Sequence, residues 1–507
     1  MRVPPNLILA SACALTALAR ADEPQIKPVS YYKEIRPLFQ AQCQGCHQPA
    51  KAQGGYVMTD FKKLVEGGES AIKGEKAIIA TDPDHSLLVS QITPANGEPE
   101  MPKKKPPLPS ADIQLIRRWI VEGATDDTPA NARQRFDNEH PPVYTRPATV
   151  TSLDFSPDGQ LLAVTGFQEV LLHKTDGSGL AGRLVGLSQR IESARFSPDG
   201  KWLAAAGGQP ARMGEVQIWD VAKRKLAMSV PVTFDTVYGV SWSPDSKTVA
   251  FGCSDKTVRA IDAATGQQVL QLSTHSDWVL DTVFSFKGDH VISVSRDMSA
   301  KLTEFASQRF VDNITSITPG ALRGGIHAVA RHPKRDEILI GGADGVPQAY
   351  RVFRTTARKI GDDATHIRQF PAMEGRIYSV GYSPDGTRMA AGSSLDGKGH
   401  INICTADYDD KLPPEIEKLL TRDVKALTGN DSVELEKYLN AGVQLLHSIP
   451  FDSGIYALAF SADGKTLAAS GEDGKVRLID IVSGTIVKEF IPVPIGTPGL
   501  AESLPTP

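Results

Sequence analysis

Cysteine is scarce in this chain. Most of the sequence also lacks long hydrophobic runs and blocks of one charge. Five cysteines occur in 507 residues, and three of them, Cys13, Cys253 and Cys404, stand alone. A structural zinc site normally needs two pairs of cysteine or histidine ligands, so this scarcity argues against one. The net charge is −4 without a long basic block, which argues against a nucleic-acid partner held through phosphate contacts. No apolar run after residue 21 is long enough to cross a bilayer.

The two remaining cysteines lie in the pentapeptide Cys43-Gln44-Gly45-Cys46-His47, which predicts covalent haem attachment. Each thiol can add across a vinyl group of haem c, and His47 then binds the iron as its proximal ligand. A thiol redox pair needs no histidine and normally lies near a βαβ pattern, so a plain disulfide is the main alternative. The pentapeptide occurs once, so we expect one haem per chain and not a two-haem peroxidase.

The first 21 residues predict a signal peptide. Arg2 supplies a short basic region, residues 7–18 form an apolar run too short to span a bilayer, and Ala19-Arg20-Ala21 fits a small-x-small cleavage site. Cleavage would remove Cys13 and leave a mature chain that begins near Asp22. Haem is attached to such motifs on the outer face of the bacterial inner membrane. Leader and pentapeptide therefore both predict an exported, periplasmic or extracytoplasmic protein with no integral membrane segment after cleavage.

Residues 22–127 predict a small all-α domain of the class I cytochrome c type. A short helix over residues 31–42 leads into the pentapeptide, and Pro37 is expected to kink or restart it. Ser110 is the expected N-cap of an amphipathic helix over residues 111–122, which stops at Gly123. A helix before the haem motif, crossed by a C-terminal amphipathic helix, is the plan of such a cytochrome.

Met101 is the expected distal iron ligand. It lies just before the last helix in the loop Glu98-Pro99-Glu100-Met101-Pro102, whose prolines stiffen the backbone. A neutral thioether favours ferrous iron and raises the reduction potential. The alternatives are His85, which would lower the potential, Met58, which is expected to pack in the core, and an open sixth position.

Several further motifs follow in a fixed order around the haem residues: Ile35-Arg36-Pro37-Leu38, Gly54-Gly55, Glu66-Gly67-Gly68, Asp82-Pro83-Asp84-His85-Ser86-Leu87, Met101-Pro102 and Trp119-Ile120-Val121-Glu122-Gly123-Ala124. Together with the pentapeptide they resemble the planctomycete-type cytochrome c domain, over about a fifth of the chain. The resemblance implies haem c bound through Cys43 and Cys46, with His47 and Met101 as iron ligands. The chain departs from the family in Lys103-Lys104-Lys105, which we expect to be a solvated loop rather than a docking site for an acidic redox partner.

A second region, residues 147–492, repeats one turn sequence. The pattern Ser-Pro-Asp-Gly or a close variant starts at Ser156, Ser197, Ser243, Ser383 and Ser461, with degenerate copies at Ser285 and His332. Each turn joins an alternating strand to a strand of small residues, and a third strand and a Thr-Gly or Ser-Gly hairpin follow. Seven units, spaced roughly 40 to 50 residues apart until the last, are typical of four-stranded propeller blades.

This order of motifs resembles the WD40 family over about two thirds of the chain. The resemblance implies an all-β, seven-bladed propeller, and it makes the following residues structural parts of the blades: Trp219, Asp220, Asp262, His275 and Asp480. Cys253 and Cys404 fall on strands of different blades, so we expect buried thiols and no bridge between them.

Three segments depart from the repeats. Residues 412–442, between the sixth and seventh units, predict two helices that begin at Pro413-Pro414, and we expect a packed αα-hairpin rather than a docking element. Residues 128–146 predict a semi-rigid linker, and residues 493–507 predict a disordered tail.

The sequence favours an electron carrier over an enzyme. One-electron transfer through haem needs no catalytic side chain, and a propeller offers a rigid surface to a redox partner, whose identity is open. The alternative is a periplasmic oxidoreductase that holds a second cofactor or substrate in the propeller, as in the cytochrome cd1 nitrite reductases. That arrangement needs histidines that converge on the channel, whereas those of this region are scattered: His173, His275, His290, His327, His332, His366, His400 and His447. A scaffold that had lost its haem would show a damaged pentapeptide or distal loop, and neither is damaged.

Overall fold

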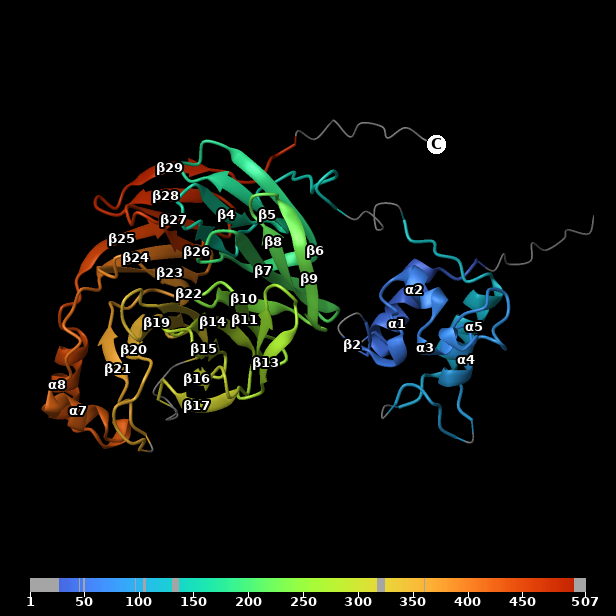
Figure 1. Ribbon diagram of the computed structural model, residues 1–507, viewed down its shortest axis with the longest axis horizontal. Coiled ribbons are helices and arrows are strands. Elements are labelled where there is room, and N and C mark those ends of the chain that lie inside the picture. The colour runs from blue at the N-terminus through green and yellow to red at the C-terminus, as the bar shows by residue number, and fades with distance from the viewer. Residues whose placement is uncertain are drawn as a thin grey trace, which may run out of the picture. The chain divides into compact units, whose positions relative to one another are not determined.

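The computed structural model describes residues 27–44, 46–48, 51–95, 97–103, 106–129, 136–316, 324–359 and 361–496. Contacts divide the chain into two units, shown as ribbons in Figure 1: Met1–Gln42 with Phe61–Pro129, and Cys43–Asp60 with Ala130–Pro507. The predicted signal peptide and two residues of the lysine run, Lys104 and Lys105, lie outside the described residues.

The first unit is helical. Its elements are a π-helical turn η1 (Tyr31–Ile35), α1 (Arg36–Gln42), α2 (Phe61–Glu66), α3 (Glu69–Ile72), α4 (Leu87–Ile92) and α5 (Ser110–Val121). The predicted helix over residues 31–42 restarts at Arg36, where π geometry changes to α geometry. Pro37 has no N–H to donate to the carbonyl oxygen four residues earlier, so regular α-helical hydrogen bonding is interrupted at this point.

The start of α5 corrects one prediction. Ser110 is the first residue of α5, and the cap position is Pro109, with φ −54° and ψ 142° and no side-chain cap hydrogen bond. Because Pro109 has a fixed φ and a ψ outside the helical range, the helical backbone begins at the next residue. The predicted end is correct, since Gly123 follows α5 with a φ of +101°, which favours glycine.

Trp119 of α5 forms the centre of the core of this unit. Its ring stacks on Tyr31, with centroids 5.5 Å apart, and meets the rings of Phe39 and Phe61 edge-on at 6.3 Å. Its side chain is 1% exposed, and its Nε1 donates to the carbonyl oxygen of Thr125 at 3.0 Å. Aromatic packing therefore joins the first and last helical segments, as the predicted plan requires.

The second unit contains a large β-rich region with one seven-stranded sheet followed by five four-stranded sheets. The seven-stranded sheet consists of β3 (Leu153–Phe155), β4 (Leu161–Thr165), β5 (Phe167–Lys174), β6 (Leu180–Phe196), β7 (Trp202–Gln209), β8 (Met213–Asp220) and β9 (Lys225–Thr233). In this sheet the long strand β6 pairs with β5 through its first part and with β7 through its second part. One strand is therefore shared by two groups of four.

The remaining sheets follow in chain order. They are β10 (Val237–Trp242), β11 (Thr248–Cys253), β12 (Val258–Asp262) and β13 (Gln268–Leu272); β14 (Val279–Phe284), β15 (His290–Ser295), β16 (Ala300–Glu304) and β17 (Arg309–Asn313); β18 (Ile326–Arg331), β19 (Glu337–Gly342), β20 (Gln348–Arg351) and β21 (His366–Gln369); β22 (Arg376–Tyr382), β23 (Arg388–Leu395), β24 (Lys398–Thr405) and β25 (Leu445–Phe451); and β26 (Ile455–Phe460), β27 (Thr466–Gly471), β28 (Val476–Asp480) and β29 (Ile486–Phe490). Neighbouring strands within each sheet are antiparallel.

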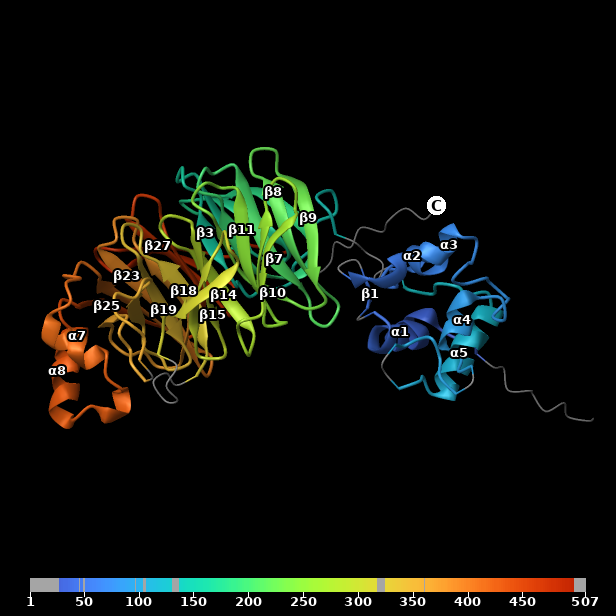
Figure 2. The same cartoon turned by 60° about the horizontal axis from the view of Figure 1, so that its bottom comes forward.

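The first strands of successive groups pack against one another. The order of contacts is β3, β6, β10, β14, β18, β22 and β26, and β26 contacts β3 in turn. The first and last sheets are thus neighbours, as the colours in Figures 1 and 2 show, although they share no strand. Hydrogen bonds that link them include those from Val150 N to Gly471 O at 3.0 Å and from Thr149 Oγ1 to Glu472 O at 3.3 Å.

Side chains on these first strands, or directly before them, bond to the backbone of the first strand of the next group. Ser152 Oγ accepts from Ala194 N at 3.1 Å, and Ser193 Oγ accepts from Val240 N at 3.2 Å. Two later pairs repeat the arrangement at 3.1 Å: Asp281 Oδ2 with Val329 N, and Ser379 Oγ with Leu458 N. We call these contacts the cross-sheet hydrogen bonds.

The repeated turns have one common geometry. In the five turns that begin with serine and have aspartate two positions later, the serine Oγ donates to that aspartate at 2.5 to 2.6 Å. The same Oγ accepts a backbone N–H five positions along the chain at 2.9 to 3.0 Å. The degenerate copy at His332 uses Nδ1 instead, which accepts the N–H groups of Lys334 and Arg335 at 3.1 Å.

The helical insertion is present, but its position differs from the prediction. Helices α7 (Pro414–Leu420) and α8 (Gly429–Leu439), with a short turn η3 (Val424–Ala426) between them, lie between β24 and β25. The insertion therefore interrupts the sixth unit and does not separate the sixth from the seventh. The fourth strand of that unit follows the insertion, and the distance along the chain concealed its pairing with β24.

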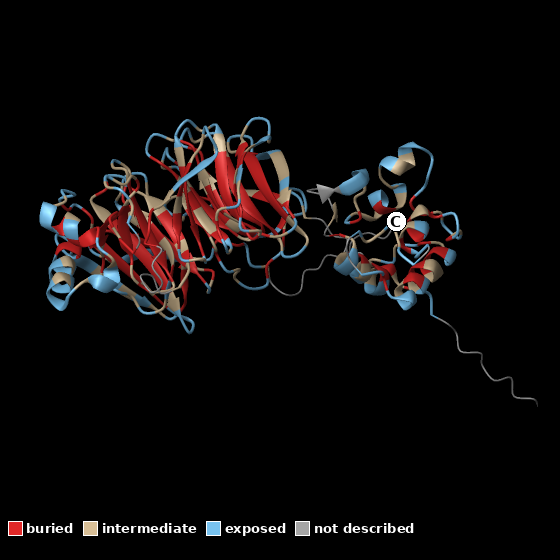
Figure 3. Cartoon of the chain, turned by 90° about the horizontal axis from the view of Figure 1, so that it is seen from below, coloured by how far each residue is buried: buried red, intermediate tan, exposed pale blue. Residues whose placement is uncertain are grey.

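The insertion packs on the sheet that precedes its own. Arg368 of β21 has its guanidinium 4.8 Å from the Tyr408 ring centroid and 4.6 Å from that of Tyr438, and its Nε donates to Ala441 O at 2.9 Å. Figure 3 shows buried residues concentrated in the strands and exposed residues on the insertion helices. The expected packed hairpin is present.

Contacts at the two ends of the β-rich region differ from the predicted linker and the predicted disordered tail. Val493 is buried, and Ile495 forms a parallel β-bridge with Tyr144, so residues 493–496 are ordered where a disordered tail was predicted. Tyr144, within the predicted linker, is also buried. Its hydroxyl donates to the buried carboxylate of Glu169 at 2.6 Å. Cys253 and Cys404 are buried thiols outside any disulfide, as predicted.

Replacing Ser243 with alanine tests the turn geometry. The change removes a hydroxyl that both donates to Asp245 and accepts from Thr248 N, so the free energy of unfolding should fall by about 1 to 2 kcal/mol. Urea unfolding followed by fluorescence measures the loss. Ser273→Ala, at an exposed serine, is the matched control. Equal midpoints for the two variants would contradict the assigned role.

Candidate functional site

The pentapeptide forms a tight turn directly after α1. The backbone N–H groups of Cys46 and His47 both donate to Cys43 O at 3.1 Å. The turn thus brings the three predicted residues Cys43, Cys46 and His47 together. Both cysteines are half-exposed thiols that take part in no disulfide. Two adjacent accessible thiols and a following imidazole are the groups that covalent haem attachment requires.

His47 is suited to bind iron. Burial lowers the pKa of its imidazole, so the ring is neutral at pH 7, which is the form that binds metals. Its Nδ1 is buried and makes no hydrogen bond within the part of the chain that the structure describes.

The segment after the pentapeptide closes back on it. Strand β1 (His47–Gln48) pairs with β2 (Lys51–Ala52), and the 3-10 turn η2 (Gln53–Gly55) follows. Met58 N donates to His47 O, and the Gln44 side-chain amide donates to Met58 O, both at 2.8 Å. Met58 is 1% exposed, so it packs in a core, as predicted for this alternative ligand.

The two other candidate ligands lie in the first unit. Met101 is half-buried, and its backbone N–H donates to Gln91 O at 2.8 Å, which ties the loop to α4. His85 is largely exposed, and its Nδ1 is 2.8 Å from Asp82 Oδ2. A half-buried thioether on an anchored loop is the better candidate, because the exposed imidazole already has a carboxylate partner.

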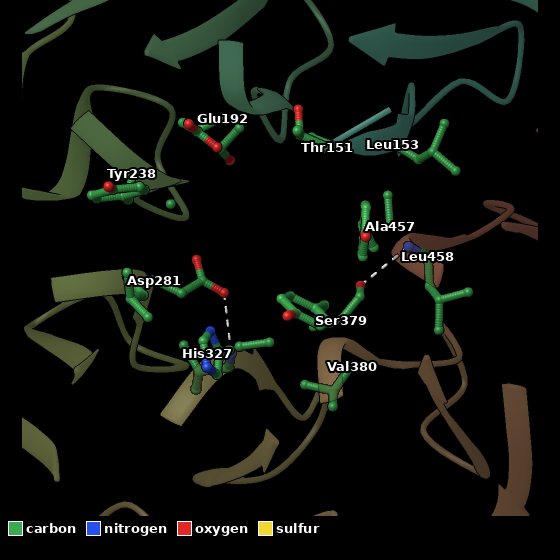
Figure 4. A pocket seen from close by; sticks show the side chains of 18 of the residues that line it. Thr151, Leu153, Glu192, Tyr238, Asp281, His327, Ser379, Val380, Ala457 and Leu458 are labelled. Carbon is green, nitrogen blue, oxygen red and sulfur yellow. Dashed lines mark hydrogen bonds between the residues drawn. The ribbon is translucent and has the colours of Figure 1, made fainter. Parts of the chain in front are cut away.

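A cavity of about 420 Å³ lies where the first strands of the β-rich region meet. Figure 4 shows side chains that converge on it from several strands. Several residues of each first strand or its immediate approach line it, and one of them lies at an equivalent position in every group: Thr151, Glu192, Tyr238, Leu280, His327, Tyr378 and Tyr456. We call these seven residues the cavity ring.

Irregular strand pairing directs the cavity ring inward. At six of the seven positions the register between first and second strands shifts at the ring residue or directly after it, as between Ile326 and Ala328 on β18. A β-bulge re-aims a side chain in this way, because its extra residue is released from the regular alternation.

The cavity ring escaped the sequence analysis, although a signal for it exists. Each member lies five positions before the first residue of its turn, as Thr151 lies before Ser156 and His327 before His332. The repeated turns were recognised in the sequence, but the constant distance of five positions from each turn back to an inward-pointing residue was not. The diverse chemistry of the seven residues conceals the shared position.

Two partly buried aspartates lie on the first strands near the cavity. Burial raises the pKa of Asp154 and of Asp281 to about 6, although Arg195 opposes the shift in both cases. Asp154 accepts the N–H of Phe196 at 2.7 Å, and Asp281 accepts those of Thr282 and Val329. These carboxylates fix the backbone.

Most histidines of the β-rich region have structural roles. His275 is buried, with Nδ1 2.9 Å from Asp297 Oδ2 and Nε2 2.8 Å from Ser293 Oγ, as expected for a blade residue. Only His327 of the eight candidates lines the cavity. Within the described residues, no group of three His, Cys, Asp or Glu side chains is placed to hold a metal ion.

Comparison with known proteins identifies the class of each region. Residues 43–105 match the family model described as Planctomycete cytochrome C. Residues 140–168, 364–401 and 444–480 match the WD domain, G-beta repeat, and residues 231–287 match the Anaphase-promoting complex subunit 4 WD40 domain. These matches confirm the predicted fusion of a planctomycete-type cytochrome c domain with WD40 repeats. The cytochrome match implies haem c binding and suggests an extracytoplasmic protein.

Curated relatives match part of the chain. Eukaryotic translation initiation factor 3 subunit I of Drosophila simulans is 23% identical over 199 residues, which cover 38% of this chain and 59% of that protein. The corresponding subunit of Aspergillus terreus is 27% identical over 181 residues, or 33% of this chain and 50% of that protein. The chain thus spans little more than half the length of these relatives. None of the described helices is long and apolar enough to cross a membrane.

The buried carboxylate of Asp281 predicts a pH-dependent stability. Its pKa in the folded protein is about 6, above the ordinary value of 3.8, so the folded state favours the protonated carboxyl group. The stability that the protonated group contributes is fully present below pH 4 and is lost as the pH rises through 6. The unfolding free energy of Asp281→Asn relative to the unchanged protein should therefore increase by roughly 3 kcal/mol between pH 4 and pH 7. Urea unfolding at a series of pH values measures this slope, and a constant difference would contradict the raised pKa.

Proposed function

We propose that this protein is an exported monohaem c-type cytochrome that transfers single electrons, and that its WD40 region is a seven-bladed propeller that binds partner proteins. In this proposal Cys43 and Cys46 bind haem c covalently, His47 is the proximal iron ligand and Met101 is the distal one. The observation that carries it is the turn in which both thiols and the imidazole come together, within the segment that matches the cytochrome family.

Bound haem c supplies reversible exchange between ferric and ferrous iron. The two thioether links fix the position of the group against the turn, and His47 presents a neutral nitrogen. The thioether of Met101 favours the reduced state because it is soft and uncharged. No side chain has to transfer a proton or form a further covalent bond, so the residues serve electron transfer without catalysis.

The proposed domains are a signal peptide at residues 1–21, a cytochrome c domain at 22–127, a linker at 128–146 and the propeller at 147–492. Support for seven blades comes from the seven groups of strands and from the order of first-strand contacts, in which the last group adjoins the first. WD40 repeats generally mediate protein–protein contacts, which supports the scaffold role. The redox partner is proposed as a protein, not a nucleic acid.

The alternative, an oxidoreductase with a second cofactor in the propeller, has weaker support. Its cavity would offer one imidazole, that of His327, where such a site needs several. Translation initiation is not proposed for this chain, because the match to the relative that carries that name covers 38% of its length.

The first test is covalent haem content. The full chain, produced in a host that attaches haem c, should carry one haem and exceed the mass of the mature polypeptide by that group. Replacing Cys43 and Cys46 together with serine should abolish the in-gel haem stain after denaturation, because no thioether link remains. Cys253→Ser, at a buried thiol elsewhere, is the matched control and should keep the stain. A colourless, haem-free product from the unchanged chain would refute the proposal.

The second test concerns the distal ligand. Met101→Ala should abolish the thioether-to-iron charge-transfer band and lower the reduction potential, because a soft neutral donor is lost. Absorbance spectroscopy and redox titration measure both effects. His85→Ala should leave both unchanged. If the band persists in the Met101 variant, or disappears in the His85 variant, the assignment is wrong.

A further inference from the structure

The cavity in the β-rich region has two unlike walls. The four residues with permanently charged or acidic side chains that line it all lie on β6 and β14: Arg190, Glu192, Arg195 and Asp281. The opposite wall comes from β18, β22, β26 and β3 with its approach, which follow one another in the order of strand contacts. Apart from the imidazole of His327, the side chains of this second wall are apolar, aromatic or hydroxyl-bearing. Figure 4 shows Glu192 across the cavity from Val380.

The arginines of the charged wall already have partners. Arg195 Nη1 donates to Ser152 Oγ at 2.8 Å and to Leu153 O at 2.9 Å. Arg190 Nε lies 2.5 Å from Glu192 Oε1, and the Arg190 side chain is 63% exposed, so water solvates the rest of its guanidinium. Neither cation is therefore placed to bind a further anion in the cavity.

The carboxylates of the same wall can accept more hydrogen bonds. The Glu192 side chain is 12% exposed, and Arg190 is the direct partner of its carboxylate among the described residues. Asp281 accepts one backbone N–H at each oxygen, from Thr282 at 2.9 Å and from Val329 at 3.1 Å. Because an ionised carboxylate has about four lone-pair sites, both groups keep capacity for a donor that enters the cavity.

These two carboxylates are also poorly compensated. Burial raises the pKa of Glu192 although Arg190 opposes the shift, and it raises the pKa of Asp281 to about 6 although Arg195 opposes it. A pKa raised by burial means that the anion is less stable in this place than in water. A cation in the cavity would supply the missing compensation.

The second wall offers aromatic faces to the same ligand. The rings of His327 and Tyr378 have centroids 5.3 Å apart, and those of Tyr378 and Tyr456 meet at 5.0 Å in a T-shaped contact. All three residues line the cavity. The face of a tyrosine ring attracts a cation and also packs against a carbon skeleton.

His327 adds no competing charge. Burial, and then the positive charges of Arg376 and Arg296, lower the pKa of its imidazole to about 4, so the ring is neutral at pH 7. These two arginines do not line the cavity. Their charge disfavours a cation beside His327 and favours one beside Glu192, which Figure 4 shows on the far side of the cavity.

We propose that this cavity binds an organic ammonium ion with an apolar body. The carboxylate of Glu192 accepts its N–H groups, and the negative charge of Asp281 adds to the attraction. Its carbon skeleton lies against the second wall, on the rings of Tyr378 and Tyr456. The cavity volume of about 420 Å³ lies in the range of small-ligand sites, so the ligand is a small amine or the lysine side chain of a partner polypeptide. The site uses only residues of the β-rich region, so it does not depend on haem binding.

Calorimetric titration of the full chain at pH 7 with benzylamine and with neutral benzyl alcohol tests the proposal. Benzylamine should bind at least about tenfold more tightly, because only its ammonium group forms charge-assisted hydrogen bonds with a carboxylate. Glu192→Gln should weaken benzylamine binding by about tenfold and leave benzyl alcohol unchanged. Glu374→Gln is the matched control, since this glutamate is exposed and does not line the cavity, and it should leave both affinities unchanged.

Arg190→Ala should change the affinity in the opposite direction. The variant removes the cation that competes for Glu192, so benzylamine should bind about threefold more tightly. A merely structural role of the ion pair would give a loss of affinity instead. Equal affinities for benzylamine and benzyl alcohol, no benzylamine binding at millimolar concentration, equal effects of Glu192→Gln and Glu374→Gln, or unchanged or weaker binding in Arg190→Ala would each overturn the proposal.

A second titration distinguishes the two sources of the ammonium group. The probe is a tetrapeptide that contains one lysine and has both ends blocked, and its control is the norleucine counterpart. Tighter binding of the lysine peptide than of benzylamine, lost in Glu192→Gln, assigns the site to a polypeptide partner. Tighter binding of benzylamine assigns it to a free amine. Both results support recognition of an ammonium ion, whereas equal binding of the lysine and norleucine peptides would contradict it.

Discussion

The β-rich region depends on the cross-sheet hydrogen bonds between its first strands. One such repeat unit cannot bury its hydrophobic face alone, so each sheet has to pack on its neighbours. Ser152, Ser193, Asp281 and Ser379 each give the backbone of the first strand in the next group a partner that its own ladder does not supply. Gly239 occupies the corresponding position on β10, where a Cβ would meet Asp281 Oδ1 at 2.3 Å, so close backbone approach replaces the hydrogen bond there.

The cross-sheet hydrogen bonds and the cavity meet at the bulges of three first strands. On β6, β14 and β22 the residue that makes the cross-sheet hydrogen bond directly follows the register shift, and the residue at the shift lines the cavity. The fold requires a residue at this position but does not restrict its type. Threonine, glutamate, leucine, histidine and tyrosine all occur in the cavity ring. Residues that are free to vary in this way are available for recognition.

Local features were predictable from the sequence and distant pairings were not. The pentapeptide, the turns at Ser156 and its counterparts, and the helices of the insertion are each encoded within a few residues, so their existence followed from the sequence. The start of α5 was misjudged by one position because Pro109 and Ser110 are both acceptable near a helix start. The insertion was assigned to the wrong place because strand β25 pairs with β24 across it. The cavity ring was missed because its members are far apart in the sequence and differ in chemistry.

The joint between β26 and β3 has a consequence for how the protein comes apart. Every other pair of adjacent sheets is also connected by a short stretch of chain, so their separation frees few conformations. Thr149 and Glu472 are 323 positions apart, and no strand crosses from one sheet to the other. Loss of this contact releases the largest loop in the region and therefore gains the most chain entropy. We expect thermal opening to start at this joint, next to the bridge between Tyr144 and Ile495, and to spread from it through the neighbouring sheets.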